Sequence, residues 1–295
     1  MSKAGFVALV GTPNAGKSTL FNRLVGERLA AITPKPQTTR FRIPGILTKG
    51  EVQYIFVDTP GWIGAPKNVW HHSLNHQSLT TAKEADVVVW VIPGHKPLEA
   101  FPEAIQTFLE GCATLIGALT HLDLLPPTER STRIALWRSD LSPFPLKALI
   151  DVSTDQPLEP LLEAIAQLLP KSPFLYPPEE LTTLPTRFFV AEILREKLYQ
   201  HLHEELPYGT EVEITTYRES PEKDYIAATI YVEKESHKPM IIGTKGQMIK
   251  KIGMEARKEI EQFLGKSVFL ELYVKVAPAW RHSQRRLHSL GYQLP

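Results

Sequence analysis

Length, composition and charge narrow the possible classes of protein. The chain has 295 residues, 43% of them hydrophobic, which suits about two folded domains and argues against global disorder. Its single cysteine, Cys112, excludes a disulfide framework and a cysteine-based zinc site. No apolar run approaches the roughly 18–20 residues of a membrane-spanning helix, and we expect no signal peptide before the first strand.

The net charge of +1 hides an uneven distribution along the chain. Residues 1–236 carry 22 Lys and Arg against 28 Asp and Glu, whereas residues 237–295 carry 11 against 4. A basic C-terminal fifth favours contact with a polyanion. An ordinary solvated basic face would carry the same charge, so the charge alone leaves both interpretations open.

The first 170 residues alternate short apolar strands with helical stretches. The expected strands are 6–10, 43–47, 52–57, 86–92, 114–120 and 148–152. Helices are expected to begin near Lys17, Lys67, Ala100, Thr128 and Leu158. The near-continuous apolar character of the strands is typical of buried parallel strands. The series predicts an α/β fold with a doubly wound sheet, in which ligands bind at the carboxyl ends of the strands.

A phosphate-binding loop follows the first expected strand. Residues 11–18 read G-x-x-x-x-G-K-S between a strand and a helix, which is the context this P-loop motif needs. Backbone N–H groups and the positive end of the helix dipole would surround the phosphates. Lys17 would reach the β- and γ-phosphates, and Ser18 would bind Mg²⁺. The nucleotide-binding residues predicted here are Gly11, Thr12, Pro13, Asn14, Ala15, Gly16, Lys17, Ser18 and Thr19.

Two later segments are expected to complete the phosphate site. Asp58 begins a D-T-P-G motif behind a strand, and an Asp in this place pairs with Mg²⁺, usually through water. The backbone N–H of Gly61 would face the γ-phosphate. The polar, proline-punctuated loop 33–40 would supply a threonine hydroxyl, and we favour Thr39 over Thr38. The candidate catalytic residues are Lys17, Thr39 and Gly61, and the candidate metal ligands are Ser18, Thr39 and Asp58.

Together these motifs resemble those of translation-factor-class GTPases. The context of residues 37–46, Q-T-T-R-x-R-I-x-G-I, is similar to the Era family in particular. The resemblance implies GTP and GDP as ligands, Mg²⁺ as cofactor, and hydrolysis of GTP to GDP and phosphate. Such proteins recognise guanine with an N-K-x-D motif and carry an S-A pair on the last strand. The residues that stand at these two motifs are Thr120, His121, Asp123, Ser153 and Thr154.

The sequence departs from the family pattern at these base-binding motifs. Asp123 keeps the carboxylate that accepts hydrogen bonds from guanine, whereas Thr120 offers one hydroxyl in place of an amide. His121 replaces the lysine and would stack on the base. Each lost neutral hydrogen bond is worth roughly 0.5–1.5 kcal/mol, so we expect weaker nucleotide binding with the preference for guanine retained.

Trp62 directly follows the D-T-P-G motif. Ras-type GTPases place there a glutamine that orients the attacking water, and an indole cannot do this. Slow intrinsic hydrolysis is therefore expected. Packing of Trp62 beneath the loop is compatible with the same expectation.

A proline-rich stretch separates two domains that differ in their predicted order of helices and strands. Residues 171–186 contain four prolines, which mark an extended, semi-rigid linker. We assign residues 1–170 to the first domain, 187–276 to a smaller α+β domain, and 277–295 to a basic C-terminal tail. Either a short RNA-contacting helix or a frayed surface end would suit the tail.

The second domain has the predicted order α-β-β-α-α-β. Residues 187–206 have helical spacing, two alternating segments follow at 211–218 and 225–233, and a helix to about Leu264 precedes a strand at 267–276. A G-x-x-G loop at residues 243–246 joins the two later helices. This arrangement resembles a type II KH domain, whose loop holds about four nucleotides of single-stranded RNA. The candidate RNA-binding residues are Ile241, Ile242, Gly243, Thr244, Lys245, Gly246, Lys250 and Lys251.

The resemblance to the Era family covers nearly the whole chain. It implies a GTPase switch that binds the 3′ end of 16S ribosomal RNA and assists maturation of the small (30S) ribosomal subunit. It further implies a cytoplasmic protein, expected to be a monomer, with occasional peripheral association with the inner membrane. Two other interpretations stay open, namely an RNA-binding module with a largely silent nucleotide domain and a P-loop ATPase with relaxed base choice.

Overall fold

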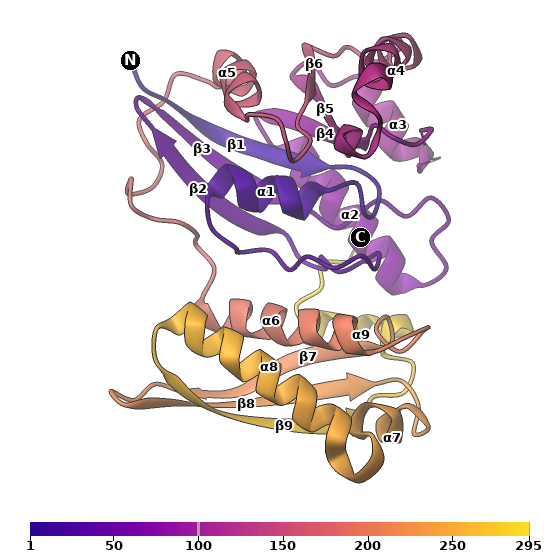
Figure 1. Ribbon diagram of the computed structural model, residues 1–295, viewed down its shortest axis with the longest axis vertical. Helices are drawn as coiled ribbons and strands as arrows, with labels where there is room; N and C mark the ends of the chain where they lie inside the picture. Colours follow the sequence, from indigo (N-terminus) through magenta and orange to yellow (C-terminus); the bar gives the residue numbers. More distant parts are fainter. Residues whose placement is uncertain (99–100, 295) are drawn as a thin grey trace.

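The structure is a computed structural model that describes residues 1–98 and 101–294. It contains two sheets, each with its own helices, which lie one above the other in Figure 1. Four of the expected helix starts lie within two residues of those observed. The fifth, near Ala100, lies outside the described residues. Among the described helices, none has the length and apolar character needed to cross a membrane.

The N-terminal sheet has the order β2-β3-β1-β4-β5-β6, which confirms the predicted doubly wound α/β fold. Helices α1 and α5 cover one face of this sheet, and α2, α3 and α4 cover the other. The strands are β1 (Lys3–Val10), β2 (Ile43–Lys49), β3 (Val52–Asp58), β4 (Val87–Pro93), β5 (Leu115–Thr120) and β6 (Ala148–Asp151). The helices are α1 (Lys17–Val25), α2 (Val69–Glu84), α3 (Glu103–Glu110), α4 (Pro127–Asp140) and α5 (Glu159–Leu168).

One strand departs from the predicted parallel arrangement. β2 pairs antiparallel with β3, so that Ile43 lies opposite Asp58 and Lys49 opposite Val52. Only Gly50 and Glu51 separate the two strands, and Gly50 adopts a left-handed φ of 60°. A two-residue turn makes a hairpin, because a parallel pair needs a crossover of a dozen or more residues.

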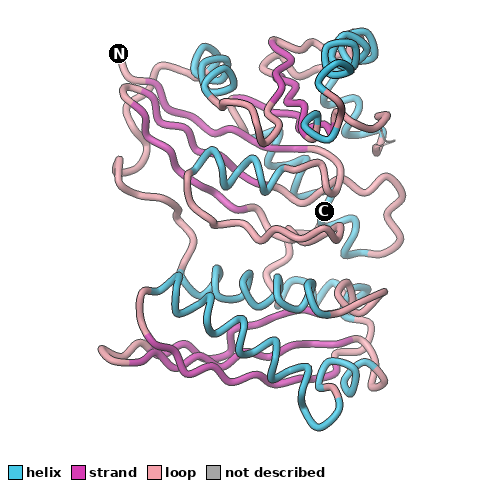
Figure 2. The backbone as a smooth tube through the Cα atoms, viewed as in Figure 1, coloured by secondary structure: helices cyan, strands magenta, loops and turns pink. Residues whose placement is uncertain are grey.

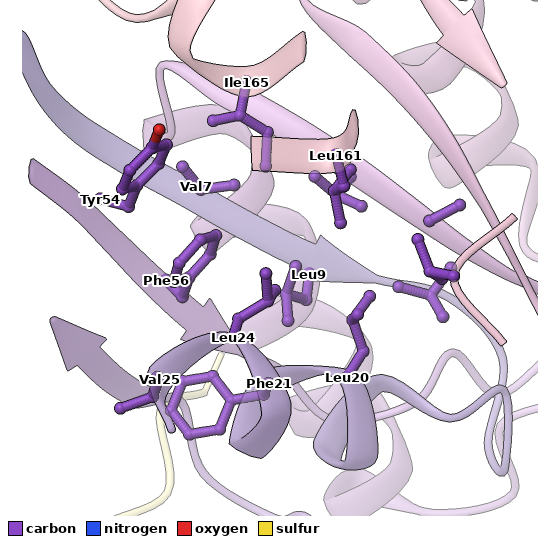
Figure 3. Packing of buried hydrophobic residues seen from close by; sticks show 14 of the residues in the cluster. Val7, Leu9, Leu20, Phe21, Leu24, Val25, Tyr54, Phe56, Leu161 and Ile165 are labelled. Atoms are coloured by element: carbon purple, nitrogen blue, oxygen red, sulfur yellow. The ribbon is translucent and has the colours of Figure 1, made fainter. Parts of the chain in front are cut away.

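The core under α1 fixes where the P-loop lies. Figure 3 shows Leu20 and Leu24 of α1 turned toward Leu9 of β1 and the Phe21 ring beside Val25, and all five side chains are buried in one cluster. A Cβ added at Gly45 of β2 would lie 2.7 Å from the Phe21 ring, so this close approach of helix and sheet requires glycine. The helix that follows the loop is therefore held rigidly against the sheet.

The C-terminal sheet has the order β7-β8-β9, with β7 antiparallel and β9 parallel to β8. Helices α6 and α8 pack against one face of this sheet. The elements confirm the predicted α-β-β-α-α-β order and are α6 (Thr186–His201), β7 (Thr210–Arg218), β8 (Lys223–Val232), α7 (His237–Ile242), α8 (Gln247–Leu264) and β9 (Ser267–Val276).

Helix α6 ends earlier than the predicted residue 206. It stops at His201 because Leu202 is extended, with φ −90° and ψ 150°. The ammonium group of Lys35, from the loop 33–40, donates to the carbonyls of Tyr199 and Leu202. These are carbonyls that a helix C-terminus leaves without partners inside the helix. A residue of the first domain thus helps to end a helix of the second.

The proline-rich segment 171–186 is bound to the N-terminal sheet. Figure 2 shows it as a long loop that runs beside the N-terminal sheet before it enters α6. The Gln53 side chain hydrogen-bonds the backbone of Leu175 and Tyr176, and Thr182 donates to the carbonyl of Pro44. The segment is therefore extended along β2 and β3 and fixed to them.

The basic C-terminal tail is not the frayed surface end that was one of its two predicted forms. It contains a short helix, α9 (Gln284–Ser289), as the other form predicted, and Trp280, Leu287 and Tyr292 of the tail are buried in one cluster with Trp70 and Leu74 of α2. Contact of this helix with RNA stays a prediction. Trp280 is fully buried, its indole N–H donates to the carbonyl of Gly209 at 3.1 Å, and its ring lies 5.8 Å from that of Trp70. Ser73 of α2 donates to the carbonyl of Gln293. The tail is a structural link between the two domains.

A buried guanidinium joins the loop 33–40 to the second sheet. Arg40 is fully buried, and its Nη1 donates to the Glu211 carboxylate at 2.8 Å and to the Thr210 carbonyl at 2.6 Å. Its Nη2 donates to the Tyr199 hydroxyl at 2.8 Å. Glu211 also accepts from Arg195 at 2.7 Å. Although burial alone would raise the pKa of Glu211, Arg195 and Arg40 lower it to about 2.

The depressed pKa of Glu211 predicts a particular acid sensitivity. Its contribution to the free energy of unfolding is fully present above pH 4.5, the ordinary value, and is lost as the pH falls toward about 2. At neutral pH, Glu211→Gln should lower that free energy by about 3 kcal/mol, because it leaves buried guanidinium charge uncompensated. Denaturant titrations followed by tryptophan fluorescence should show that the difference in free energy of unfolding between wild type and Glu211→Gln decreases as the pH falls from 4.5 to about 2. A Glu159→Gln control, at an exposed ion pair with Lys49, should change little. A gap of constant size over this pH range would contradict the assignment.

Candidate nucleotide site and candidate RNA loop

The P-loop turns at the carboxyl edge of the sheet, between β1 and α1. Gly11 has φ 151°, and a Cβ there would lie 2.3 Å from the carbonyl oxygen of Val91. Gly16, directly before α1, has a left-handed φ of 88°. A pocket of about 320 Å³ lies over this turn and is walled on its other side by the loop 33–40. The loop that the sequence predicted for phosphates thus borders a cavity.

Lys17 lies within this pocket and is bound to the loop that precedes it. Its Nζ donates to the carbonyls of Gly11 at 3.1 Å and Thr12 at 2.8 Å. Burial lowers the pKa of Lys17 to about 8, and the charge of Asp58 opposes that shift. The ammonium group is held against the P-loop and lines the pocket, so it would meet the phosphates of a bound nucleotide.

The three predicted metal ligands come together from three separate segments. The Ser18 hydroxyl donates to Asp58 at 2.7 Å and lies 2.9 Å from the Thr39 hydroxyl, which also donates to Asp58. The other oxygen of Asp58, Oδ1, is buried without a hydrogen-bond partner among the described residues. Two hydroxyls and a carboxylate with an unused oxygen form a donor set that fits Mg²⁺.

The hydroxyl of the neighbouring Thr38 forms its hydrogen bonds within the loop 33–40. The Thr38 hydroxyl donates to the Lys35 carbonyl at 2.9 Å and lies 2.6 Å from the Thr33 hydroxyl. The geometry therefore favours Thr39 over Thr38 as the metal ligand. Burial raises the pKa of Asp58 to about 6, an effect that the Lys17 charge opposes and that a divalent cation would also oppose.

Gly61 and Trp62 have opposite orientations relative to the pocket. Gly61 lines the pocket, and a Cβ there would lie 2.7 Å from the Pro13 backbone. The Trp62 side chain points away, since its indole N–H donates to Ser78 at 2.8 Å and its ring packs on Trp90. Trp62 is 2% exposed, so it packs beneath the loop and supplies no group that could orient water.

The residues predicted for the base lie near one another at the β5 and β6 ends. His121, with a left-handed φ of 60°, lines the pocket beside Gly16. The Asp123 carboxylate accepts from the hydroxyl of Thr154. Thr120 was predicted to face the base, but its hydroxyl donates to the Ala15 and Ile92 carbonyls instead, at 2.7 and 3.2 Å. The Thr120 side chain therefore positions the P-loop.

The Ser153 side chain is also buried in the protein interior. It is 2% exposed, and its hydroxyl accepts from the backbone N–H of Leu122 at 2.9 Å. Sequence reasoning missed His95, whose ring packs edge-to-face on that of His121 with centroids 5.3 Å apart. No motif or spacing marks His95, because only the fold brings the loop after β4 beside the loop after β5.

The predicted RNA loop is exposed at the start of α8. Gly243 has φ 74°, and a Cβ there would lie 2.7 Å from that of Met248, so glycine is required at this turn. Gly246, with φ 78°, directly precedes α8. The side chains of Lys245, Lys250 and Lys251 are exposed. The loop thus presents cations and a helix N-terminus to solvent.

The prediction for Ile241 was wrong. Ile241 is 0% exposed and belongs to the apolar core between the helices and the second sheet. The short helix α7 is amphipathic, so its inward face packs on the core and cannot touch RNA. Ile242 and Ile249 are half-buried and keep some surface near the loop.

The fold and the two sites define a P-loop nucleotide-binding protein with a C-terminal KH domain. The family described as 50S ribosome-binding GTPase matches residues 6–119, and the KH domain family matches residues 205–281. GTPase Era of Caldanaerobacter subterraneus subsp. tengcongensis is 40% identical over 99% of this chain and 98% of its own length. The chain belongs to the Era family of GTPases.

Two solved structures are similar to the whole chain. Era in complex with MgGDPNP and nucleotides 1506–1542 of 16S ribosomal RNA has a TM-score of 0.94 and 36% identity, with full coverage of both chains. A single-residue variant of Era from Aquifex aeolicus, bound to GDP·AlF₄⁻, has a TM-score of 0.90 and 34% identity. The latter match covers 99% of this chain and 100% of the other.

The tight contact at Gly61 predicts the result of a small substitution. Gly61→Ala should push the turn after β3 off the P-loop, because the added methyl would meet backbone atoms of Pro13 that cannot move independently. We expect GTP affinity to fall at least about tenfold, measured by titration calorimetry with Mg²⁺. Gly111→Ala is the matched control, since its new methyl would find no atom closer than 3.6 Å. Equal GTP affinity in both variants would contradict the proposed place of Gly61.

Proposed function

We propose that this GTPase uses its nucleotide state to govern how its KH domain holds single-stranded RNA. The observation that carries the proposal is the adjacency of Thr39 and Arg40. The hydroxyl of Thr39 lies in the candidate metal site, 2.9 Å from Ser18, and the next side chain is buried against Glu211 of the second domain. Any movement of Thr39 would therefore shift Arg40 and alter the contact between the two domains.

Two further contacts tie the same loop to helix α6. The Tyr199 hydroxyl donates to the carbonyl of Gln37 at 3.1 Å, and Lys35 donates to the last carbonyls of the helix. Helix α6 packs on the sheet and on α8, the helix that starts at the RNA loop. A continuous packed route therefore runs from the phosphate pocket to the RNA loop.

The side chains around the pocket suit GTP, GDP and Mg²⁺. Lys17 and the P-loop N–H groups would bind the phosphates, and the Gly61 N–H would face the γ-phosphate. Ser18, Thr39 and Asp58 would hold Mg²⁺, which when bound would neutralise charge on the phosphate oxygens. Because Trp62 is turned into the core, the chain itself offers no side chain at that position to orient water. Slow intrinsic hydrolysis follows from this arrangement.

For the RNA partner we propose the 3′-end region of 16S ribosomal RNA. The support is the full-length similarity to an Era structure that contains nucleotides 1506–1542 of that RNA. The loop Gly243–Gly246 and the exposed Lys245, Lys250 and Lys251 would contact its phosphates. Ile242 and Ile249 would contribute apolar surface beneath the bases.

The wider setting of the proposal is assembly of the small (30S) ribosomal subunit in the cytoplasm. In this assignment residues 1–170 are the nucleotide domain, 187–276 the RNA domain, and 171–186 and 277–295 the two segments that fasten them together. Monomeric state and peripheral membrane association stay predictions. Membership of the GTPase family favours this proposal over a silent nucleotide domain or an ATPase.

Charge reversal in the RNA loop tests the KH assignment. Lys245→Glu should weaken binding of a single-stranded 16S 3′-end oligonucleotide at least about tenfold and reduce the salt slope of the binding constant. The exposed Lys83 of α2 supplies a matched control, because Lys83→Glu changes the net charge equally at a distant place. Fluorescence anisotropy at several salt concentrations measures both effects. Equal losses in the two variants would remove the loop from the RNA site.

Removal of the buried guanidinium tests the coupling between the sites. In wild type we expect RNA affinity to differ at least about fivefold between the GTP-analogue and GDP forms. Arg40→Met should bring that ratio close to one, while nucleotide affinity without RNA changes less than about threefold. Arg42→Met is the control, since Arg42 is 44% exposed and pairs with Glu84 at the surface. Thermal unfolding shows whether the variants remain folded. A wild-type ratio in folded Arg40→Met would contradict the coupling.

A further inference from the structure

The loop after β4 places a second imidazole beside the base end of the nucleotide pocket. We propose that His95 is a positioning residue that holds the His121 ring against the P-loop, where this ring would stack on the base. The inference rests on the proposed guanine-nucleotide site and adds to it the residue that keeps His121 in place. His95 is not among the residues that line the pocket, so it acts only through its contact with His121.

The His121 ring extends from the end of β5 to the P-loop. It lines the pocket, and a Cβ added at Gly16 would lie 3.3 Å from its Nε2. The ring can approach this closely because Gly16 has no side chain. Packing against a glycine does not by itself fix a histidine side chain, which can rotate about two bonds. A second contact is therefore needed to keep the ring in one orientation.

His95 supplies this second contact. Its ring packs edge-to-face on that of His121, with the centroids 5.3 Å apart and the planes at 81°. An edge-to-face arrangement is one that aromatic pairs prefer. Burial and the positive charges nearby lower the pKa of His95, so its ring is uncharged at neutral pH. His95 thus supports the neighbouring ring without adding a charge beside the base.

The backbone that carries His95 is tied to the elements around it. The Gly94 N–H donates to the Thr120 carbonyl at 2.8 Å, which joins the loop after β4 to the end of β5. The Gly94 carbonyl accepts from the Trp137 indole of α4 at 2.9 Å. A Cβ added at Gly94 would lie 2.8 Å from the Leu122 side chain, so glycine allows the two loops to approach each other. These contacts place residue 95 beside residue 121.

The hydrogen-bonding capacity of His95 is not used by the fold. Its Nδ1 is buried and has no hydrogen-bond partner among the described residues. A buried polar atom without a partner costs stability, so packing alone would be served better by an apolar ring. What His95 gives to His121 is therefore the contact between the two rings and not a hydrogen bond.

The test measures the affinity of the full chain for GDP with Mg²⁺ by titration calorimetry. His95→Ala should weaken GDP binding roughly three- to tenfold, because the ring contact is lost and GDP must order His121 as it binds. His95→Phe keeps an uncharged ring and should bind GDP within about twofold of wild type. His95→Asn keeps a polar group but no ring, so it should weaken binding as His95→Ala does. Thermal unfolding shows which variants are folded, and His95→Asn replaces His95→Ala if the latter is not.

A double-mutant cycle shows whether His95 acts through its neighbour. His121→Asn removes the second ring, and asparagine tolerates the left-handed backbone at this position. In that background, His95→Ala should change GDP affinity by less than about twofold. A purely structural role would give the same loss in both backgrounds, and that result would overturn the proposal. So would wild-type affinity in His95→Ala, or a loss in His95→Phe as large as in His95→Ala.

The same titrations separate failure of this inference from failure of the proposed function. If wild type does not bind GDP, the nucleotide site itself is wrong. If wild type binds GDP and the folded His95 variants bind it equally well, only the role of His95 is wrong.

Discussion

The burial of one positive charge organises the contact between the two domains. Arg40 leaves the loop that covers the phosphate pocket and enters the second domain, where Glu211 compensates its charge. Taking a guanidinium out of water costs several kcal/mol unless acceptors replace the water, and here they come from Thr210, Glu211 and Tyr199. The loop therefore cannot withdraw from the second domain without removing one of the two guanidinium partners of the buried Glu211. This constraint makes the loop a shared part of both sites.

The C-terminal tail reinforces the same contact. The rings of Trp70 and Trp280 lie next to each other, with the Arg40 guanidinium 4.9 and 5.8 Å from their centroids, and the Tyr292 hydroxyl donates to Glu211. Aromatic faces attract a buried cation and exclude water from its partners. The last residues of the chain thus close a site whose first component lies at residue 40. The C-terminal tail therefore helps to enclose the charge of Arg40, which lies near the N-terminus of the sequence.

Much of this architecture could be predicted from the sequence because it is local. The G-x-x-x-x-G-K-S loop, Asp58 and the G-x-x-G turn each depend on a few neighbouring residues, and the alternating strands and helices fix the order of elements. The partners of Arg40 could not be predicted, since Tyr199 and Glu211 lie some 160–170 residues away. Ile241 was misplaced because the sequence shows that a residue is apolar but not which neighbour covers it. The contact between Asp123 and Thr154 likewise exists only because β5 and β6 are adjacent.

Hydrogen exchange tests the central claim most directly, because it reports on each backbone amide separately. The full chain is compared in its GDP form and its GTP-analogue form, each with Mg²⁺. If Arg40 transmits the state of the pocket, protection should change at the end of α6 and the start of β7, around Tyr199 and Glu211, as well as in the loop 33–40. Changes confined to the P-loop and residues 33–62, with the second domain unaffected, would contradict the account.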